Sequence, residues 1–144
     1  MTGVQTCALP ISEKYDLVKA TPGSAGYDLR FLGRHPEMIG AREILMINTG
    51  IRIASELPAF VYGRSSWGAK YGITLANGVG VIDSDYRGEI KVALINNGPH
   101  LVEIKPGDRI AQLVPSVGEP EPVKVKQLAS TKRGAGGFGS TGVN

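Results

Sequence analysis

The chain has 144 residues, which is enough for one domain with a substantial core and too few for two. Its 42% hydrophobic and 20% charged residues are typical of an ordinary soluble globular protein. The net charge of +3 comes from scattered Lys and Arg, so we predict no nucleic-acid partner. No apolar run approaches the roughly 18–20 residues that cross a bilayer, so no membrane partner is predicted. The single cysteine, Cys7, excludes an internal disulfide and a multi-cysteine metal site.

The first segment, residues 2–11 (TGVQTCALPI), reads like the translation of a short-read sequencing adaptor, with Met1 from a GTG start inside it. It has neither strand nor helix periodicity, nor the plan of a signal peptide. We interpret residues 1–11 as an adaptor scar that replaces the native N-terminus; a natural flexible arm is the alternative. A missing N-terminal strand would leave a sheet edge unpaired. Without a native N-terminus no targeting segment is readable, and we expect a cytoplasmic location if the source is bacterial or phage.

Residues 12–131 contain short β-type runs separated by Gly, Pro and Asn. This spacing predicts an all-β domain, a jelly-roll-like barrel or sandwich, with turns at Gly98-Pro99 and Pro106-Gly107. Only residues 65–71 look helical, with Ser65 or Ser66 as the cap. The predicted strands are 27–31, 43–48, 50–54, 59–63, 78–82, 89–95, 101–104, 109–114 and 123–128.

The C-terminal segment, residues 132–144, differs in composition, because KRGAGGFGSTGVN has five glycines and little to bury. Such a segment cannot offset its ordering entropy alone, so a disordered tail is one interpretation. The other is a flexible lid whose N–H groups wrap an anion, with charge from Arg133 and a flat face from Phe138. It is not a Walker loop, because Gly-Lys-Ser/Thr is missing.

The segment GVIDSDYRGE, residues 80–89, carries the strongest chemical signal. An apolar strand ends at Asp83, and Tyr86 follows three residues later. A carboxylate that leaves an apolar strand can be held as a general base, and an aromatic beside it can pack against a ring-shaped substrate. A strand that ends in an acidic turn is the alternative interpretation.

Five segments together identify a family. In order, spacing and content they resemble the five motifs of the trimeric dUTP diphosphatases (dUTPases), over residues 21–142. The resemblance implies a homotrimer with interface sites: the first, second and fourth motifs come from one chain, the third from another and the lid from the third. It implies that dUTP and water give dUMP and diphosphate, which limits uracil in DNA and supplies dUMP for thymidylate synthesis. The segments are GSAGYDL (23–29), GRSSWGAK (63–70), ANGVGVIDSDYRGE (76–89), PGDRIAQL (106–113) and RGAGGFGST (133–141).

A triphosphate site needs cations, hydroxyls and backbone N–H groups, which Arg64, Ser65 and Ser66 supply. By resemblance these residues hold the α- and β-phosphates, and Gln112 reaches a phosphate; an N-cap with a surface arginine is the alternative. Trp67 departs from the family motif, which usually has a Leu- or Met-sized residue there, and we expect it to change packing rather than chemistry. Asp108 and Arg109 are expected to brace their turn. The resemblance assigns further substrate contacts in the lid to Arg133, Phe138, Gly139 and Ser140.

The same resemblance places the base in the hairpin of the third motif. The uracil edge is read by Asn77 and by the main chain of Val81, Ile82 and Lys91, although Asn77-Gly78 also fits a plain hairpin turn. A strand that matches uracil leaves polar groups mismatched against cytosine. Tyr86 packs on the deoxyribose and leaves no space for a 2′-hydroxyl; a buried core tyrosine is the alternative.

The chemical step is implied in the same way. Asp83 is the general base that activates the water attacking the α-phosphorus, and Asp85 falls to a turn role. Asp28 binds a water of a Mg²⁺ ion that is held mainly by the substrate phosphates.

Two other functions stay open. A dCTP deaminase shares the fold and an RSS motif, but lacks the pairing of IDSDYRGE with a Gly-rich, Phe-bearing tail. A catalytically silent regulatory or phage interaction protein could use the same trimer, and the intact Asp83 argues against it.

Overall fold

The computed structural model describes residues 6–10, 16–116, 122–123 and 125–136, with the backbone alone described at 6–10 and 122–123. The predicted all-β domain with one short helix is confirmed. The elements are β1 (Thr6–Pro10), β2 (Tyr27–Arg30), β3 (Glu37–Ile39), β4 (Ile44–Asn48), β5 (Ile51–Ala54), β6 (Ala59–Gly63), α1 (Ser65–Tyr71), β7 (Ile73–Leu75), β8 (Gly80–Ile82), β9 (Lys91–Asn96), β10 (Val102–Ile104), β11 (Arg109–Pro115) and β12 (Pro122–Val123).

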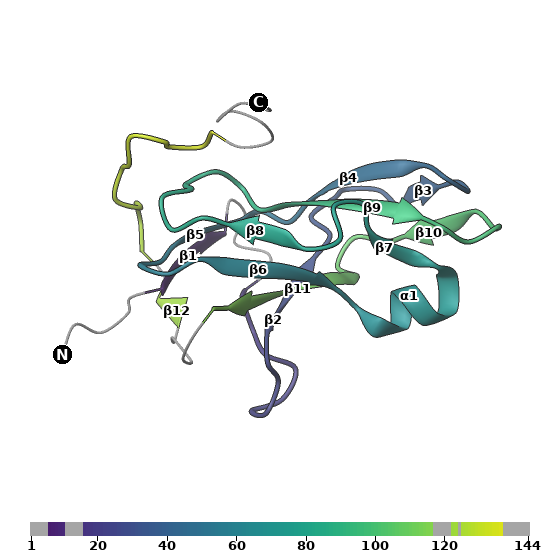
Figure 1. The fold of residues 1–144 in the computed structure, drawn as a ribbon, viewed down its shortest axis with the longest axis horizontal. Helices are drawn as coiled ribbons and strands as arrows, with labels where there is room; N and C mark the ends of the chain where they lie inside the picture. The colour runs from purple at the N-terminus through teal and green to yellow at the C-terminus, as the bar shows by residue number, and fades with distance from the viewer. Residues whose placement is uncertain (1–5, 11–15, 117–121, 124, 137–144) are drawn as a thin grey trace.

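The strands form a sandwich-like arrangement around one core. The sheets have the strand orders β2-β11-β6-β8, β4-β9-β7, β12-β1-β5 and β10-β3. In Figure 1, β4 and β9 run along one side of the molecule and β6 and β11 along the other, with α1 at one end and β1 and β12 at the opposite end. A single cluster of buried apolar side chains, from Leu29 to Leu113, joins these sheets. The arrangement leaves β8 as an edge strand, and this edge becomes part of the site below.

Alternation along the strands explains which face is buried. In β9 every second side chain is buried, ending with Leu94 and the fully buried Asn96. Burial of the polar Asn96 is tolerated because its side-chain amide donates hydrogen bonds to the carbonyls of Ile39 and His100 at 3.0 and 2.7 Å. In β11 the alternation shifts at a bulge between Arg109 and Ala111. Arg109 lies at this bulge, and Gln112, beyond it, lies opposite Asp28 in the ladder.

Most predicted strands are confirmed, with three differences. Residues 123–128 were predicted as strand, but among the described residues of that run only Val123 lies in one. The prediction missed β3 and β7, which have three residues each and are too short to show a period of two. The run 123–128 alternates well, but its described residues 125–128 have no partner strand, and alternation alone does not make a ladder.

The expectation of an unpaired sheet edge near the N-terminus is wrong. The backbone of β1 pairs antiparallel with β5 and parallel with β12. Such a ladder is made by main-chain N–H and C=O groups, which nearly every residue type carries, so the side-chain pattern gave no warning of it. The adaptor origin of residues 1–11 stays a prediction.

The helix α1 forms where it was predicted, but its cap differs. The N-cap is Arg64, and no side chain caps the helix, so Ser65 and Ser66 lie in the first turn with exposed side chains. The C-terminal end is Gly72 at φ 71°, a left-handed conformation that favours glycine. A Cβ at Gly72 would lie 2.7 Å from the Gly98 nitrogen, and one at Gly98 would lie 2.4 Å from the Tyr71 carbonyl oxygen. The two glycines let the helix end sit directly on the β9–β10 turn.

Candidate active site

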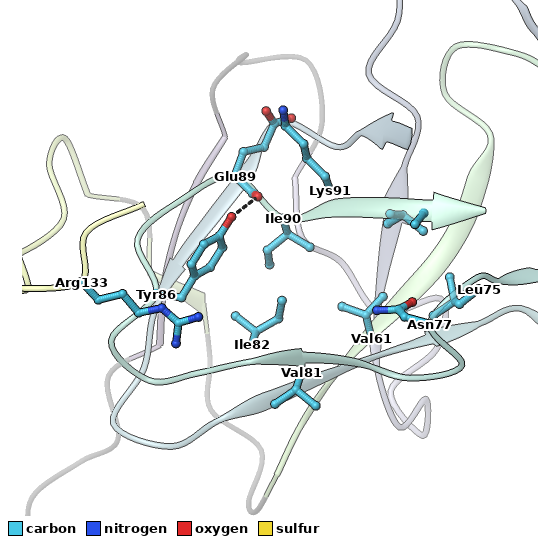
Figure 2. Close-up of a pocket in the computed structure, with 13 residues that line it drawn as sticks. Val61, Leu75, Asn77, Val81, Ile82, Tyr86, Glu89, Ile90, Lys91 and Arg133 are labelled. Atoms are coloured by element: carbon cyan, nitrogen blue, oxygen red, sulfur yellow. Dashed lines mark hydrogen bonds between the residues drawn. The ribbon is translucent and has the colours of Figure 1, made fainter. Parts of the chain in front are cut away.

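A cavity of about 240 Å³ opens between the edge of β8 and the first half of β9. In the described part of the chain no ladder joins these two strands: β8 pairs with β6, and β9 pairs with β4 along most of its length but with β7 only from Leu94 on, so that Lys91 and Val92 have no ladder partner on the β7 side. Figure 2 shows Ile82, Ile90 and Val61 pointing toward the cavity, while Val81 points away from it. Val81 therefore offers its main chain to the cavity and keeps its side chain 60% exposed on the other face of β8. Unpaired main-chain groups on an open strand edge can pair with the edge of a planar base.

The predicted base-reading residues meet at this cavity. They include the side chain of Asn77 from the β7–β8 turn and Lys91 at the start of β9. The predicted hairpin is not formed, because β7 pairs with β9 and β8 pairs with β6; the connection is a β-turn in which Gly78 at φ 72° donates to the Leu75 carbonyl oxygen at 3.1 Å. Both predicted roles of Asn77-Gly78, as turn and as cavity lining, are therefore compatible with the geometry.

Tyr86 closes one side of the cavity (Figure 2). Its hydroxyl donates to the main-chain oxygen of Glu89 at 2.8 Å. Burial, and then the negative charge of Glu89, raise the pKa of Tyr86, while the cations Arg133 and Arg52 act in the opposite direction. The ring is half-buried and lines the cavity, so it is not the core tyrosine of the alternative interpretation.

Asp83 follows directly after Ile82, at the end of β8. Its carboxylate is paired with the guanidinium of Arg133, which also lies 3.4 Å from Asp85 and 5.8 Å from the centre of the Tyr86 ring. The hydrogen bond to Asp83 raises the pKa of Arg133. Arg133 also lines the cavity, so the described part of the tail lies against the base-side residues of its own chain.

Several hydrogen bonds hold this part of the tail. Thr131 donates its hydroxyl to the Asp85 carbonyl at 2.6 Å. Arg87 donates its backbone N–H to the carbonyl of Gly134 at 2.6 Å, and its Nε to the carbonyl of Ala129 at 3.0 Å. The turn role predicted for Asp85 is in keeping with the first of these contacts. Phe138, Gly139 and Ser140 lie outside the described residues.

A second group of predicted residues surrounds Asp28. Asp28 is 8% exposed, and its two carboxylate oxygens accept from Arg64 at 2.6 Å and from Arg109 at 3.3 Å. Gln112 lies opposite Asp28 in the β2–β11 ladder. A buried carboxylate between two arginines fixes their positions, because leaving it unpaired would be costly.

Sequence reasoning underestimated Arg109. Both Asp108 and Arg109 were expected to brace the turn: Asp108 does so, since its carboxylate accepts the Lys105 N–H at 2.8 Å, whereas the guanidinium of Arg109 contacts Asp28. The β-bulge turns Arg109 toward Asp28, and no sequence pattern marked that bulge. Trp67 donates its indole N–H to the Arg109 carbonyl at 2.8 Å and lies beside the Tyr71 ring, so its contacts are those of packing.

The two groups are separate within one chain. Among the described residues that line the base-side cavity, none belongs to the group of Asp28, Arg64, Ser65, Ser66 and Gln112. No cluster of three or more His, Cys, Asp or Glu suited to a metal ion occurs in the described residues. Nor is any described helix both long and apolar enough to span a membrane.

Comparisons with known proteins agree with this geometry. A family model described as dUTPase matches residues 13–142. A deoxyuridine 5′-triphosphate nucleotidohydrolase of Desulfitobacterium hafniense (strain DSM 10664 / DCB-2) is 53% identical over 131 residues, covering 87% of this chain and 85% of that protein. The protein of the same name from Coxiella burnetii (strain RSA 493 / Nine Mile phase I) is 46% identical over 129 residues, covering 87% and 85%.

Solved structures show the same fold. The Streptococcus mutans dUTPase superposes with a TM-score of 0.67 at 28% identity, covering 80% of this chain and 99% of that one. The Staphylococcus bacteriophage 80alpha dUTPase with dUPNHPP gives 0.68 at 23% identity, covering 96% and 99%, and supports the fold alone. With the family model and the bacterial relatives, these matches confirm the resemblance: the chain belongs to the dUTPase family.

Proposed function

We propose that this chain hydrolyses dUTP to dUMP and diphosphate. The observation that carries the proposal is the cavity between two open strand edges, with Tyr86 on one side and Asp83 at the end of the strand that lines it. Family membership and the name shared by the bacterial relatives support the same activity. In a bacterial or phage cell the reaction would take place in the cytoplasm, would limit uracil incorporation into DNA and would supply dUMP for thymidylate synthesis.

The open edges explain how uracil is chosen. The main chain of Val81, Ile82 and Lys91 offers N–H and C=O groups, and Asn77 adds an amide. Uracil and cytosine exchange donor and acceptor at N3 and at the exocyclic group, so a site that pairs with uracil leaves buried polar groups unpaired against cytosine. Such mismatches can give discrimination of about 10⁴–10⁵. The Tyr86 ring then packs on the sugar and excludes a 2′-hydroxyl.

Asp83 acts as the general base. It accepts a proton from a water, whose oxygen attacks the α-phosphorus, and the bond from that phosphorus to the bridging oxygen of the β-phosphate breaks to release diphosphate. In the structure the carboxylate of Asp83 forms an ion pair with Arg133, so it is not free to act as a base. In the proposed trimer the lid over each site comes from a different chain than Asp83, so this tail would leave its own Asp83 for a neighbouring site, where a triphosphate offers the guanidinium more oxygens and more charge than one exposed carboxylate does. Phe138, Gly139 and Ser140 would complete the lid.

The group around Asp28 serves the phosphates. Arg64, held by Asp28, presents its charge beside the exposed hydroxyls of Ser65 and Ser66, and Gln112 adds an amide. A magnesium ion fits here only as part of the substrate, because both oxygens of Asp28 already face arginines and the described residues form no metal cluster. Asp28 would then accept a hydrogen bond from a metal-held water. The ion would supply charge neutralisation for the leaving diphosphate.

The site is completed by assembly into a homotrimer. Among the described residues of one chain, the phosphate-side group and the base-side cavity have no lining residue in common, which supports a site completed by a second copy. The outward face of the β2-β11-β6-β8 sheet is suited to such contact, since Tyr62 and Val81 are 39% and 60% exposed there. The homotrimer implied by the family would place the third motif of one chain against the first, second and fourth of its neighbour, with the lid from the third chain.

One assay tests the activity against both rivals. Diphosphate release is measured with dUTP, dCTP, dTTP and UTP in parallel, with and without Mg²⁺. We expect diphosphate release from dUTP in the presence of Mg²⁺, and little or none from the other three nucleotides or without Mg²⁺. Ammonia from dCTP without diphosphate would indicate a deaminase. No turnover of any nucleotide by a folded trimer would favour a silent interaction protein.

A further inference from the structure

We propose that Gly88 and Glu89 are positioning residues that fix the Tyr86 ring in the cavity and thereby set the discrimination against a 2′-hydroxyl. The proposal rests on the function proposed above, in which Tyr86 packs on the sugar. It concerns what holds the ring, which decides how closely a sugar substituent can approach. Neither residue contacts the reacting atoms in this scheme, so both act through Tyr86.

The Tyr86 ring packs directly against Gly88, where a larger residue would not fit. A Cβ built on Gly88 would lie 2.4 Å from the Tyr86 hydroxyl oxygen and 2.5 Å from Cζ, which is well inside van der Waals contact. Gly88 has no left-handed φ, so an alanine there costs no backbone strain. The clash falls on the far end of a side chain that can rotate. The expected response to a methyl group is therefore a displaced ring in an otherwise intact loop.

Glu89 holds the Tyr86 hydroxyl by a hydrogen bond, and its own position is fixed by a second hydrogen bond. Its main-chain oxygen accepts the Tyr86 hydroxyl, the hydrogen bond drawn in Figure 2. Its carboxylate accepts the backbone N–H of Gly50 at 2.9 Å, across 39 residues of sequence. The neighbouring Thr49, which is buried, donates its hydroxyl to the Ile90 carbonyl at 2.5 Å. The β4–β5 turn thus clamps residues 89 and 90 and fixes the oxygen that holds the ring.

The other side of the loop is fixed independently. Arg87 Nη1 donates to the carbonyls of Ser84 and Tyr86 at 2.6 and 3.0 Å. The Tyr86 backbone N–H donates to the Asp83 carbonyl at 3.0 Å. These contacts involve neither Gly88 nor Glu89. When Gly88 or Glu89 is substituted, we therefore expect the Tyr86 ring to move while Asp83 keeps its position.

The test measures the ratio of kcat/KM for dUTP to that for UTP. In Gly88→Ala, Glu89→Ala and Tyr86→Phe the ratio should fall by roughly three- to tenfold, the factor that one lost hydrogen bond allows. Glu89→Gln keeps an acceptor for the Gly50 N–H and should restore the ratio of the parent protein. Glu103→Ala is a matched control for Glu89→Ala, because the ion pair that Glu103 makes among the described residues is with the exposed Lys105.

The outcomes separate the two proposals. If the parent protein hydrolyses no dUTP, both are overturned. If it discriminates, and Tyr86→Ala abolishes discrimination while Gly88→Ala, Glu89→Ala and Tyr86→Phe keep the full ratio, only the positioning roles are overturned. An unchanged ratio in Tyr86→Ala also overturns them, since there is then no filter to position. Thermal melts accompany each variant, and if Glu89→Ala does not fold, Tyr86→Phe and Gly88→Ala decide.

Discussion

Shared sites can be tested by mixing two defective chains. We choose Asp83→Asn on the base side and Arg64→Gln on the phosphate side, because the structure shows these residues in separate groups. The amide at position 83 cannot accept the proton of the water, so the first variant should lose about 10²–10⁴-fold in turnover. Glutamine at position 64 keeps a donor for the buried Asp28 while removing the positive charge. Each pure trimer is therefore expected to fold and to be nearly inactive.

Mixed trimers should recover activity of a predictable size. If each site takes Asp83 from one chain and Arg64 from another, random 1:1 assembly makes about one quarter of the sites intact, since each choice has a probability of one half. The variants are unfolded together, refolded and assayed for diphosphate release from dUTP. Asp83→Asn mixed with Asn77→Ala is the matched control: both residues belong to the same motif, so no site regains both. Activity near one quarter of the parent value in the first mixture, and none above the single variants in the control, is the expected pattern.

The opposite outcome is equally clear. If the first mixture gives no more activity than the control, one chain supplies both groups and the shared-site proposal is wrong. Size-exclusion chromatography with light scattering on each mixture shows whether trimers formed. A monomer that hydrolyses dUTP at the full rate would refute the reasoning outright.

Three further predictions concern single variants. Asp83→Asn should bind a non-hydrolysable dUTP analogue normally yet fail in single-turnover hydrolysis; near-normal hydrolysis would remove Asp83 from the base role. Thr49→Val should leave the Ile90 carbonyl and the Ile51 N–H without their hydroxyl partner and cost about 1–3 kcal/mol, read as a fall in melting temperature with retained fold; an unchanged melt would show that the hydroxyl contributes nothing. A chain that starts at Ser12 loses β1 and exposes the β5 edge, so its melt should fall; an equal melt would favour the adaptor interpretation.

The sequence was most informative where a pattern maps directly onto the backbone. The β-type runs 89–95 and 59–63 predicted β9, observed over 91–96, and β6, and the isolated helical pattern predicted α1 with its bounds. The segment after β8 could be recognised as a site because a carboxylate, an aromatic and an arginine-glycine turn follow an apolar strand. These signals are local, so they survive without knowledge of the tertiary structure.

Contacts between distant segments could not be predicted. The pairing of Arg133 with Asp83 spans 50 residues, and that of Arg109 with Asp28 spans 81. Arg109 lies at a β-bulge that no residue type in the sequence predicts. The hydrogen bond from the Gly50 N–H to the Glu89 carboxylate also joins distant segments. In the sequence Glu89 looks like part of a polar turn, and its supporting role can be inferred only from the structure.

The glycine contact at the end of α1 has a consequence for engineering. No residue of α1 is fully buried, and the helix is held by Trp67, which packs against the core and donates to the Arg109 carbonyl, and by main-chain packing of Gly72 against Gly98, with the Asn97 N–H donating to the Gly72 carbonyl at 2.9 Å. Ala69 and Lys70, both exposed, should then accept almost any side chain in a randomised library. A single methyl group at either glycine would tilt the helix that starts beside Arg64. The helix is thus open to redesign at these two exposed positions and closed to it where its end crosses the backbone of Gly98.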